Sequence, residues 1–286
     1  MPHPAAPAAW PASSPRPSLT LLAPRQALIY SPEGKCLHAY RPYEHALGVK
    51  TLAWSPGGQF LALGSFDERV RLLNQLTWQR IAEVEHLSNM RPSDFAQAVA
   101  YVEPATDGLG LGAANENDDE NARAGAVAAE AKRPPVGYVA TRPPLTVPAL
   151  KPNFDQVSPK LGVGLLQWSA SGRFLMSRND NMPCAVWVWD AANFALHTVL
   201  VQQQPVRAAA WHPRQELLAV CSGSAKLFLW SPQGCRTAPM PAEANFRVQS
   251  VEWSPNGDTM LLLDRERFCM CFMGEDGQLT GAPSGE

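Results

Sequence analysis

Short apolar runs alternate with clusters of turn residues along most of this chain, and four of the runs end in a tryptophan. Residues 49–54 read VKTLAW, residues 60–63 read FLAL and residues 70–73 read VRLL, with SPGG and SFDE in the gaps. Runs of this length, bounded by Gly, Pro, Ser and Asp, predict short antiparallel strands. A fourth run at 79–84 completes the set. The segment from 49 to 84 therefore predicts one four-stranded sheet.

The same pattern returns with a nearly constant period. Trp168, Trp211 and Trp253 are 43 and 42 residues apart, and they begin the turn sequences WSASG, WHPRQ and WSPNG. Trp54 begins WSPGG and lies 114 residues before Trp168, which is one period plus about 72 extra residues. A period of about 40 to 45 residues, built from short strands, is typical of a β-propeller blade. We therefore predict an all-β fold of stacked four-stranded blades.

The repeats predict four nearly complete blades and one half blade. The half blade comes from ALIYS at 27–31 and KCLHAY at 35–40, which we interpret as the last two strands of a blade whose first two strands are absent. The predicted organisation is a disordered Pro- and Ala-rich leader at 1–24, the half blade and one blade at 25–85, an irregular region at 86–160, three blades at 161–275 and a disordered tail at 276–286.

The region at 86–160 does not follow the repeat. Strand-like segments at 96–103 and 137–150 flank a low-complexity stretch at 105–135 that is acidic in its middle. Low hydrophobicity of this kind predicts disorder for the acidic loop. Two interpretations are open: a plain insertion between blades, or a blade of degenerate sequence enlarged by the loop. The two flanking segments favour the degenerate blade.

Composition and motifs argue against several classes of function. The 286 residues include 24 basic and 26 acidic side chains, a balance that lacks the basic excess of nucleic-acid or anionic-membrane surfaces. No apolar run approaches the length of about 18 residues that a membrane span needs. The six cysteines have no metal-site spacing, and no phosphate loop, HExxH or GxSxG motif is present. We therefore expect no enzyme activity, no cofactor and no metal.

Several residues carry a resemblance to the WD40-repeat family. His45 precedes the first strand of its blade by three residues, Asp67 lies in the tight turn before VRLLN, and Trp189 and Asp190 form the WD dipeptide. The resemblance implies that His45 and Asp67 hydrogen-bond to each other, and that Trp189 and Asp190 belong to the same kind of structural network. Leu73 replaces the tryptophan of the family pattern, so one blade lacks the full network.

A narrower resemblance is carried by residues 41–74, 159–190 and 205–235. These segments are similar to a centrosomal WD-repeat family found at centrosomes in animals and at spindle pole bodies in fungi, and SRNDNMPCAVWVWD is their most specific motif. Members of that family have further blades on the N-terminal side, so we expect a partial propeller of about four to five blades, cut from a seven-bladed ring.

The narrower resemblance implies a function as well. It implies a cytoplasmic, non-catalytic scaffold at the centrosome or spindle pole, which anchors microtubule minus ends together with a coiled-coil partner and, in fungi, a minus-end-directed kinesin. The alternative is a generic WD40 adaptor in another assembly, such as a ubiquitin ligase receptor or an RNA-processing complex.

One polar turn is a candidate for contact with a partner. Arg178, Asn179, Asp180 and Asn181 interrupt a blade that otherwise follows the repeat closely. They have more hydrogen-bonding capacity than a turn needs, which points to a partner-binding site. The alternative is that the Asn and Asp side chains hydrogen-bond to their own backbone and shape a longer turn.

Overall fold

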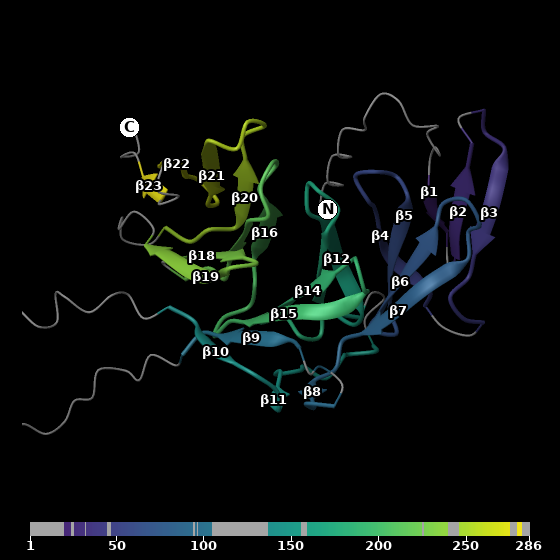
Figure 1. Cartoon of the computed structure of the whole chain (residues 1–286), viewed down its shortest axis with the longest axis horizontal. Helices are drawn as coiled ribbons and strands as arrows, with labels where there is room; N and C mark the ends of the chain where they lie inside the picture. Colours follow the sequence, from purple (N-terminus) through teal and green to yellow (C-terminus); the bar gives the residue numbers. More distant parts are fainter. Residues whose placement is uncertain are drawn as a thin grey trace, which may run out of the picture.

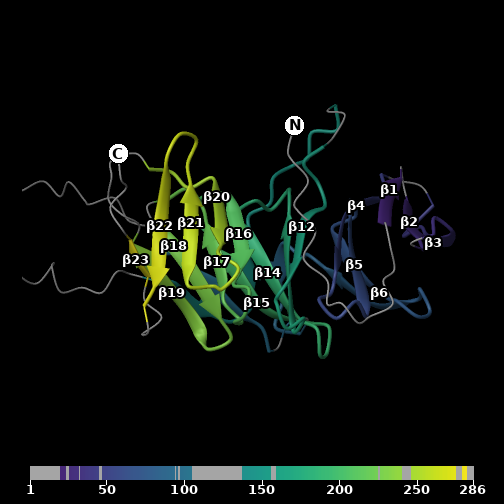
Figure 2. The same ribbon diagram turned by 90° about the horizontal axis from the view of Figure 1, so that it is seen from above.

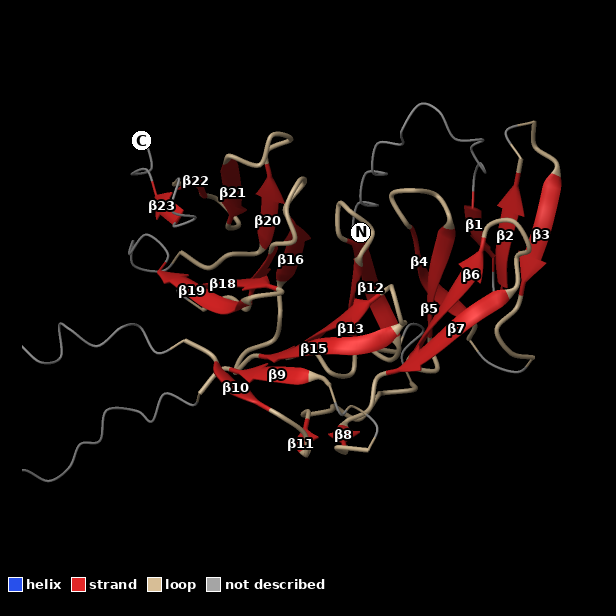
Figure 3. Cartoon of the chain, viewed as in Figure 1, coloured by secondary structure: helices blue, strands red, loops and turns tan. Residues whose placement is uncertain are grey.

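The computed structural model consists of β-strands joined by turns and loops, with no helix among the residues that it describes (Figure 3). The described residues are 20–23, 26–31, 33–44, 47–93, 95, 97–104, 137–155, 159–224, 226–239, 246–274 and 279–281.

Five sheets, numbered here in chain order, contain most of the strands. The first sheet is made of β1 (Thr20–Ala23), β2 (Gln26–Tyr30) and β3 (Cys36–Tyr40). The second is made of β4 (Val49–Trp54), β5 (Phe60–Ser65), β6 (Arg69–Asn74) and β7 (Arg80–Glu85). The third contains β12 (Val163–Trp168), β13 (Phe174–Asn179), β14 (Ala185–Asp190) and β15 (Ala195–Val201).

The last two sheets repeat the same antiparallel order. The fourth is made of β16 (Ala208–Trp211), β17 (Leu218–Cys221), β18 (Lys226–Ser231) and β19 (Gly234–Pro239). The fifth is made of β20 (Ser250–Trp253), β21 (Thr259–Leu263), β22 (Phe268–Met273) and β23 (Leu279–Gly281). Each four-stranded blade predicted from the repeat is therefore present as a sheet.

The two ends of the chain differ from the sequence prediction. The first sheet has three strands rather than two, because Thr20–Ala23, placed in the disordered leader, pairs antiparallel with β2. Likewise Leu279–Gly281, placed in the disordered tail, pairs with β22. Both short segments gain backbone hydrogen bonds from an adjacent strand edge, which composition alone does not reveal. The rest of the predicted leader and tail lies almost entirely outside the described residues.

The described part of the region at 86–160 forms no four-stranded sheet of its own, which differs from the favoured interpretation as a degenerate blade. Its segment β9 (Val99–Val102) pairs in parallel with β15, and β10 (Val139–Thr141) pairs with β9, so the third sheet has six strands. A separate pair joins β8 (Asn89–Met90) to β11 (Leu145–Thr146). The described strands β9 and β10 therefore extend the outer edge of the third sheet, and the segment between the second and third sheets is called the insertion below. The predicted acidic loop at 105–135 lies outside the described residues.

The sheets stack face to face in chain order and form an open arc rather than a closed ring (Figure 1). The first and fifth sheets lie at opposite ends of this arc in both views (Figure 2). Apolar side chains fill each junction between neighbouring sheets. This architecture confirms the predicted all-β, propeller-like fold.

The periodic tryptophans join each sheet to the one before it. Each indole nitrogen donates to the backbone oxygen of the residue that precedes the tryptophan of the previous repeat. The bonds run from Trp168 to Ala53 (3.1 Å), from Trp211 to Gln167 (3.1 Å) and from Trp253 to Ala210 (3.2 Å). The sequence period therefore records a repeated contact between consecutive sheets.

Candidate functional site

A buried chain of hydrogen bonds crosses the junction between the second and third sheets. His86 follows β7 directly and is 2% exposed. Its Nε2 atom lies 2.7 Å from the hydroxyl oxygen of Ser177, and its Nδ1 atom lies 2.7 Å from the backbone oxygen of Glu68. The indole nitrogen of Trp189 donates to the same Ser177 hydroxyl at 2.7 Å. The partners fit a neutral His86 that donates from Nδ1 and accepts from Ser177 at Nε2.

Burial sets the protonation state of His86. Removal from water lowers the pKa of the imidazole from 6.5 to about 4, although the bond to the Glu68 backbone oxygen acts in the opposite direction. The imidazole is therefore uncharged near neutral pH. Both of its ring nitrogens are occupied by partners within the fold, so it serves the junction rather than a reaction.

The WD40 resemblance implied a structural network of His45, Asp67, Trp189 and Asp190. His45 lies outside the described residues, and Asp67 hydrogen-bonds with Arg71, whose Nη1 atom is 3.0 Å from the Asp67 carboxylate. Arg71 is 4% exposed, and its Nε atom donates to Glu83 at 2.9 Å. Asp67 therefore stabilises an arginine at the first junction. One sequence feature could have pointed to His86 as a junction residue, because it directly follows the outer strand of a blade. The insertion after it obscures this position, since it separates His86 in sequence from the next sheet.

The two residues of the WD dipeptide have different roles. Trp189 is 4% exposed and belongs to the His86 network, as the resemblance implied for a structural residue. The Asp190 carboxylate instead accepts a hydrogen bond from the backbone nitrogen of Ala192 at 2.8 Å. Asp190 therefore shapes the turn after β14.

Two of the four residues proposed for partner contact are buried. Asn179 is fully buried and its side-chain nitrogen donates to a Glu68 carboxylate oxygen at 2.8 Å. Asn181 is 5% exposed, and its backbone oxygen accepts from the backbone nitrogen of Leu150 at 2.7 Å. Their burial argues against direct contact with a partner. They join the third sheet to the second sheet and to the insertion.

The other two residues of this turn are about one-quarter exposed. The Asp180 carboxylate pairs with the ammonium group of Lys50 at 2.7 Å, across the junction to the second sheet. Arg178 donates to the backbone oxygen of Val206 at 3.1 Å, toward the fourth sheet. The turn therefore links three consecutive sheets, and only Arg178 and Asp180 present accessible charge.

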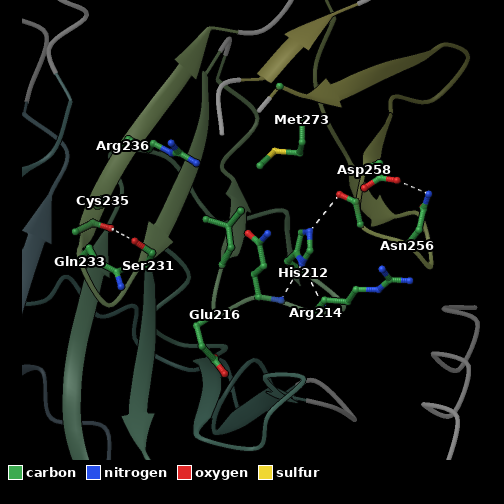
Figure 4. Close-up of a pocket in the computed structure, with 15 residues that line it drawn as sticks. His212, Arg214, Glu216, Ser231, Gln233, Cys235, Arg236, Asn256, Asp258 and Met273 are labelled. Atoms are coloured by element: carbon green, nitrogen blue, oxygen red, sulfur yellow. Dashed lines mark hydrogen bonds between the residues drawn. The ribbon is translucent and has the colours of Figure 1, made fainter. Parts of the chain in front are cut away.

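A cleft of about 1130 Å³ opens where turns of the fourth and fifth sheets diverge (Figure 4). His212 joins the two sheets here: Nε2 lies 3.1 Å from the Gly257 backbone oxygen, and Nδ1 accepts from the backbone nitrogens of Arg214 and Gln215. Burial lowers the pKa of His212. The lining residues are His212, Arg214, Gln215, Glu216, Leu217, Ser231, Gln233, Gly234, Cys235, Arg236, Asn256, Gly257, Asp258, Met273 and Gly274.

The cleft offers charges of both signs but no activated nucleophile. Burial raises the pKa of the Cys235 thiol well above its usual range, so the thiol stays protonated. The Ser231 hydroxyl donates to the backbone oxygen of Gly234 at 3.2 Å, and His212 is held by backbone groups. This chemistry suits polar binding rather than covalent catalysis.

Among the residues that the structure describes, no three His, Cys, Asp or Glu side chains are grouped to hold a metal ion. Within the same residues, no helix is long and apolar enough to cross a membrane.

Comparison with known proteins agrees with the stacked-sheet geometry. The family model of the WD domain, G-beta repeat, matches residues 34–74 and 195–231. Each match begins in or beside the outer strand of one sheet and continues through three strands of the next, from β3 to β6 and from β15 to β18. The chain therefore contains WD40 repeats.

Similar WD40 proteins occur in mouse and fission yeast. WD repeat-containing protein WRAP73 of Mus musculus is 41% identical over 249 residues, which cover 87% of this chain and 52% of that protein. An uncharacterized WD repeat-containing protein of Schizosaccharomyces pombe is 22% identical over 240 residues, covering 79% of this chain and 43% of its own length. The WD40 chain described here thus spans about half the length of these curated relatives.

A solved structure shares the WD40 chain's fold at low sequence identity. The dihydro-heme d1 dehydrogenase NirN, in complex with DHE, matches with a TM-score of 0.56 and 14% identity, over 99% of this chain and 47% of that one. At this identity the likeness concerns the fold alone.

Proposed function

We propose that this WD40 chain is a non-catalytic scaffold that binds other proteins at the centrosome or spindle pole, in microtubule anchoring and spindle organisation. The observation that carries the proposal is the 41% identity with mouse WRAP73 over 87% of the chain, taken with the motif at 177–190 that resembles the centrosomal family. The partners proposed on that resemblance are a coiled-coil centrosomal protein and a minus-end-directed kinesin. The proposed location is cytoplasmic, at these poles.

The use of the polar side chains supports a binding role. Several polar groups at the sheet junctions are paired with one another: His86 with Ser177, Asp67 with Arg71, and the Asn179 amide nitrogen with Glu68. Groups held in this way stabilise a rigid stack and are not free to take part in a reaction. Recognition then falls to the exposed turns, where charged side chains reach solvent.

We propose Arg178 and Asp180 as partner-contact residues within this function. Asp180 also pairs with Lys50, so a loss of binding in an Asp180 variant could arise from a weakened junction. The matched control is Lys50→Met, which breaks the same ion pair from the other sheet and leaves the turn intact. We expect Asp180→Asn to reduce recovery of the coiled-coil partner more than Lys50→Met does, at similar melting temperatures. Equal reductions would assign Asp180 a structural role only.

The scaffold itself is tested by purification from mitotic cells. The chain, tagged at its C-terminus, should enrich γ-tubulin and centrosomal coiled-coil proteins over an unrelated tagged WD40 protein. Enrichment of ubiquitin ligase or RNA-processing subunits instead would contradict the spindle-pole proposal and support the generic adaptor.

A further inference from the structure

The ion pair between the second and third sheets joins two positions that recur in every four-stranded sheet. Lys50 is the fourth residue before Trp54, and its ammonium nitrogen lies 2.7 Å from a carboxylate oxygen of Asp180 in the next sheet. Asp180 is the fifth residue after Leu175, which pairs with Trp168. We call the position of Lys50 the inner-strand position of its sheet and the position of Asp180 the turn position. At this junction, the inner-strand position of one sheet meets the turn position of the next.

The same two positions are found in the other sheets by counting from their tryptophans. The inner-strand positions are Lys50, Gly164, Arg207 and Gln249. The turn positions are Phe66, Asp180, Gly223 and Arg265. The residue before each inner-strand position is a valine that is at most 6% exposed, so the inner strands remain equivalent up to this point.

Arg207 lies in the fourth sheet as Lys50 lies in the second. The ammonium nitrogen of Lys50 is 4.9 Å from the centre of the Phe66 ring, at the turn position of its own sheet. In the fourth sheet, a Cβ atom added to Gly223 at the turn position would lie 3.5 Å from Cγ of Arg207. Each basic side chain therefore passes beside the turn of its own sheet, and that of Lys50 continues to the next sheet.

The turn position of the fifth sheet has the opposite charge to that of the third. Arg265 occupies the position that Asp180 occupies in the third sheet, so the counterpart of the Lys50 ion pair is a pair of arginines, Arg207 and Arg265. Both arginines are exposed. Neither forms an ion pair with another residue that the structure describes. Two like charges therefore stand where the second junction has a cation and a carboxylate.

Nearby acidic groups do not balance these charges. Where β16 and β20 begin and β21 turns into β22, the described residues include Arg207, Arg247, Arg265 and Arg267 against Asp264 and Glu266. The Asp264 carboxylate already accepts hydrogen bonds from two backbone nitrogens, at 2.8 and 3.2 Å, and lies 3.7 Å from Arg267. This end of the junction therefore carries a local excess of positive charge, in a chain whose 26 acidic and 24 basic side chains nearly balance.

We propose that Arg207 and Arg265 bind a carboxylate side chain of a partner protein, in the role that Asp180 has beside Lys50. A carboxylate has two oxygens and can accept hydrogen bonds from two guanidinium groups, and such charge-assisted bonds are stronger than neutral ones. An acidic protein segment fits this site better than a nucleic acid, because the chain as a whole lacks a basic excess. The site gives the proposed scaffold a preference for acidic partners, and it rests on that function in taking the ligand to be a protein.

A double-mutant cycle tests whether the two positions face each other. Arg265→Asp should form an ion pair with Arg207, so its effect on the melting temperature should be about 2 °C more favourable in the unaltered chain than in the Arg207→Met background. The control background is Arg173→Met, because Arg173 is exposed and lies in the turn between β12 and β13, at the opposite end of the third sheet from Asp180. There the effect of Arg265→Asp should equal that in the unaltered chain. Equal effects in the Arg207→Met background and the unaltered chain would overturn the proposed site.

Binding of the ligand is measured on the full chain by fluorescence anisotropy, with a labelled peptide of eight glutamates as the probe. The unaltered chain should bind this peptide more tightly than a matching peptide of eight glutamines. Arg207→Met and Arg265→Met should each weaken binding at least about tenfold, whereas Arg173→Met, which removes the same charge elsewhere, should leave it unchanged. Thermal melts confirm that each variant is folded.

Three results would overturn the proposal: no preference for the glutamate peptide, equal effects of the three arginine variants, or tighter binding of a single-stranded RNA than of the peptide. The probe contains no centrosomal protein, so such a failure concerns this site alone. The scaffold function is judged separately, by the purification from mitotic cells.

Discussion

The Nε2 atom of His86 lies 2.7 Å from the hydroxyl oxygen of Ser177, although the two residues are 91 positions apart in the chain. The insertion lies between them in sequence, yet the bond joins the second sheet to the third. The contact between these two sheets therefore persists across the insertion. His86 supplies the histidine for the third sheet's network from the far side of the inserted region.

Loss of the Ser177 hydroxyl should destabilise the fold. In Ser177→Ala, Trp189 loses its acceptor and His86 loses its donor, both in a buried junction, so we expect a cost of about 3 kcal/mol in the free energy of unfolding. Ser222→Ala is the control, since Ser222 is also buried but its hydroxyl bonds only to that of Ser224 among the residues that the structure describes. Urea unfolding measures both. Equal costs for the two variants would refute the role of the network.

The stability of the fold should fall in mild acid. Burial lowers the pKa of His86 to about 4 in the folded chain, against 6.5 for an ordinary histidine. Below pH 6.5 the unfolded chain binds a proton that the folded chain rejects, so stability is complete above 6.5 and is lost as pH falls toward 4. Between about pH 7.5 and about pH 5 the loss from His86 should be about 2 kcal/mol.

A substitution isolates the contribution of His86 from that of other titrating groups. Burial also lowers the pKa of His212 and of His197, so some acid sensitivity remains without His86. His86→Gln should be less stable at neutral pH but show a shallower decline between the two pH values. Parallel declines for the unaltered chain and His86→Gln would contradict a buried, neutral imidazole.

Arg71 should contribute more to stability than its neighbour Arg69. Arg71→Met leaves the Asp67 and Glu83 carboxylates without their buried partner, and we expect a cost of about 3 kcal/mol. Arg69 is 40% exposed along its side chain, so Arg69→Met should cost at most about 1 kcal/mol. Thermal and urea melts of the two variants decide the comparison. A larger cost at Arg69 would reject the assignment of Asp67 to the Arg71 cluster.

The spacing between the second and third sheets should depend on Gly64. A Cβ atom at this position would lie 2.7 Å from Thr51 Cγ2 and 2.8 Å from Val163 Cβ, too close for either. Gly64→Ala should therefore force the sheets apart at a cost of about 2 kcal/mol. Gly57→Ala, whose Cβ would meet only Gln59 Cγ at 4.0 Å, should change stability by less than about 0.5 kcal/mol.

The fourth sheet lacks the hydroxyl group that Ser177 provides in the third sheet, and a substitution should be able to supply it. Trp230 occupies the position of Trp189, but Val220 stands where the third sheet has Ser177. The Trp230 indole nitrogen is buried and has no hydrogen-bond partner among the described residues. Val220→Thr should supply an acceptor and leave stability unchanged or higher. The control Val188→Thr buries a hydroxyl without this donor and should cost about 1 to 3 kcal/mol; a similar cost at Val220 would contradict the equivalence.

The sequence predicted the sheets because their contacts repeat locally. Trp168, Trp211 and Trp253 each donate to the preceding repeat, so a constant period in the chain becomes a constant step between sheets. Turn residues such as those at 55–58 then set the strand boundaries. Regular, short-range features of this kind can be predicted directly from the sequence.

The features that could not be predicted from the sequence depend on contacts that do not repeat along the chain. The strand β9 pairs in parallel with β15 through backbone groups at the outer edge of the third sheet. Many short apolar segments could form these backbone hydrogen bonds, so the sequence does not single out β9. The bond between His86 and Ser177 spans a region of irregular sequence, and the repeat pattern did not predict that Asp67 pairs with Arg71 on the next strand. The burial of Asn179 follows from the stacking of sheets, which a polar turn sequence does not reveal.

Live imaging of the endogenous protein, tagged at its C-terminus beside a γ-tubulin marker, tests the proposed scaffold function most directly. Concentration of the tagged protein at the marked poles, increasing in mitosis, is the result that we expect. A diffuse cytosolic or nuclear signal throughout the cell cycle would contradict the spindle-pole assignment.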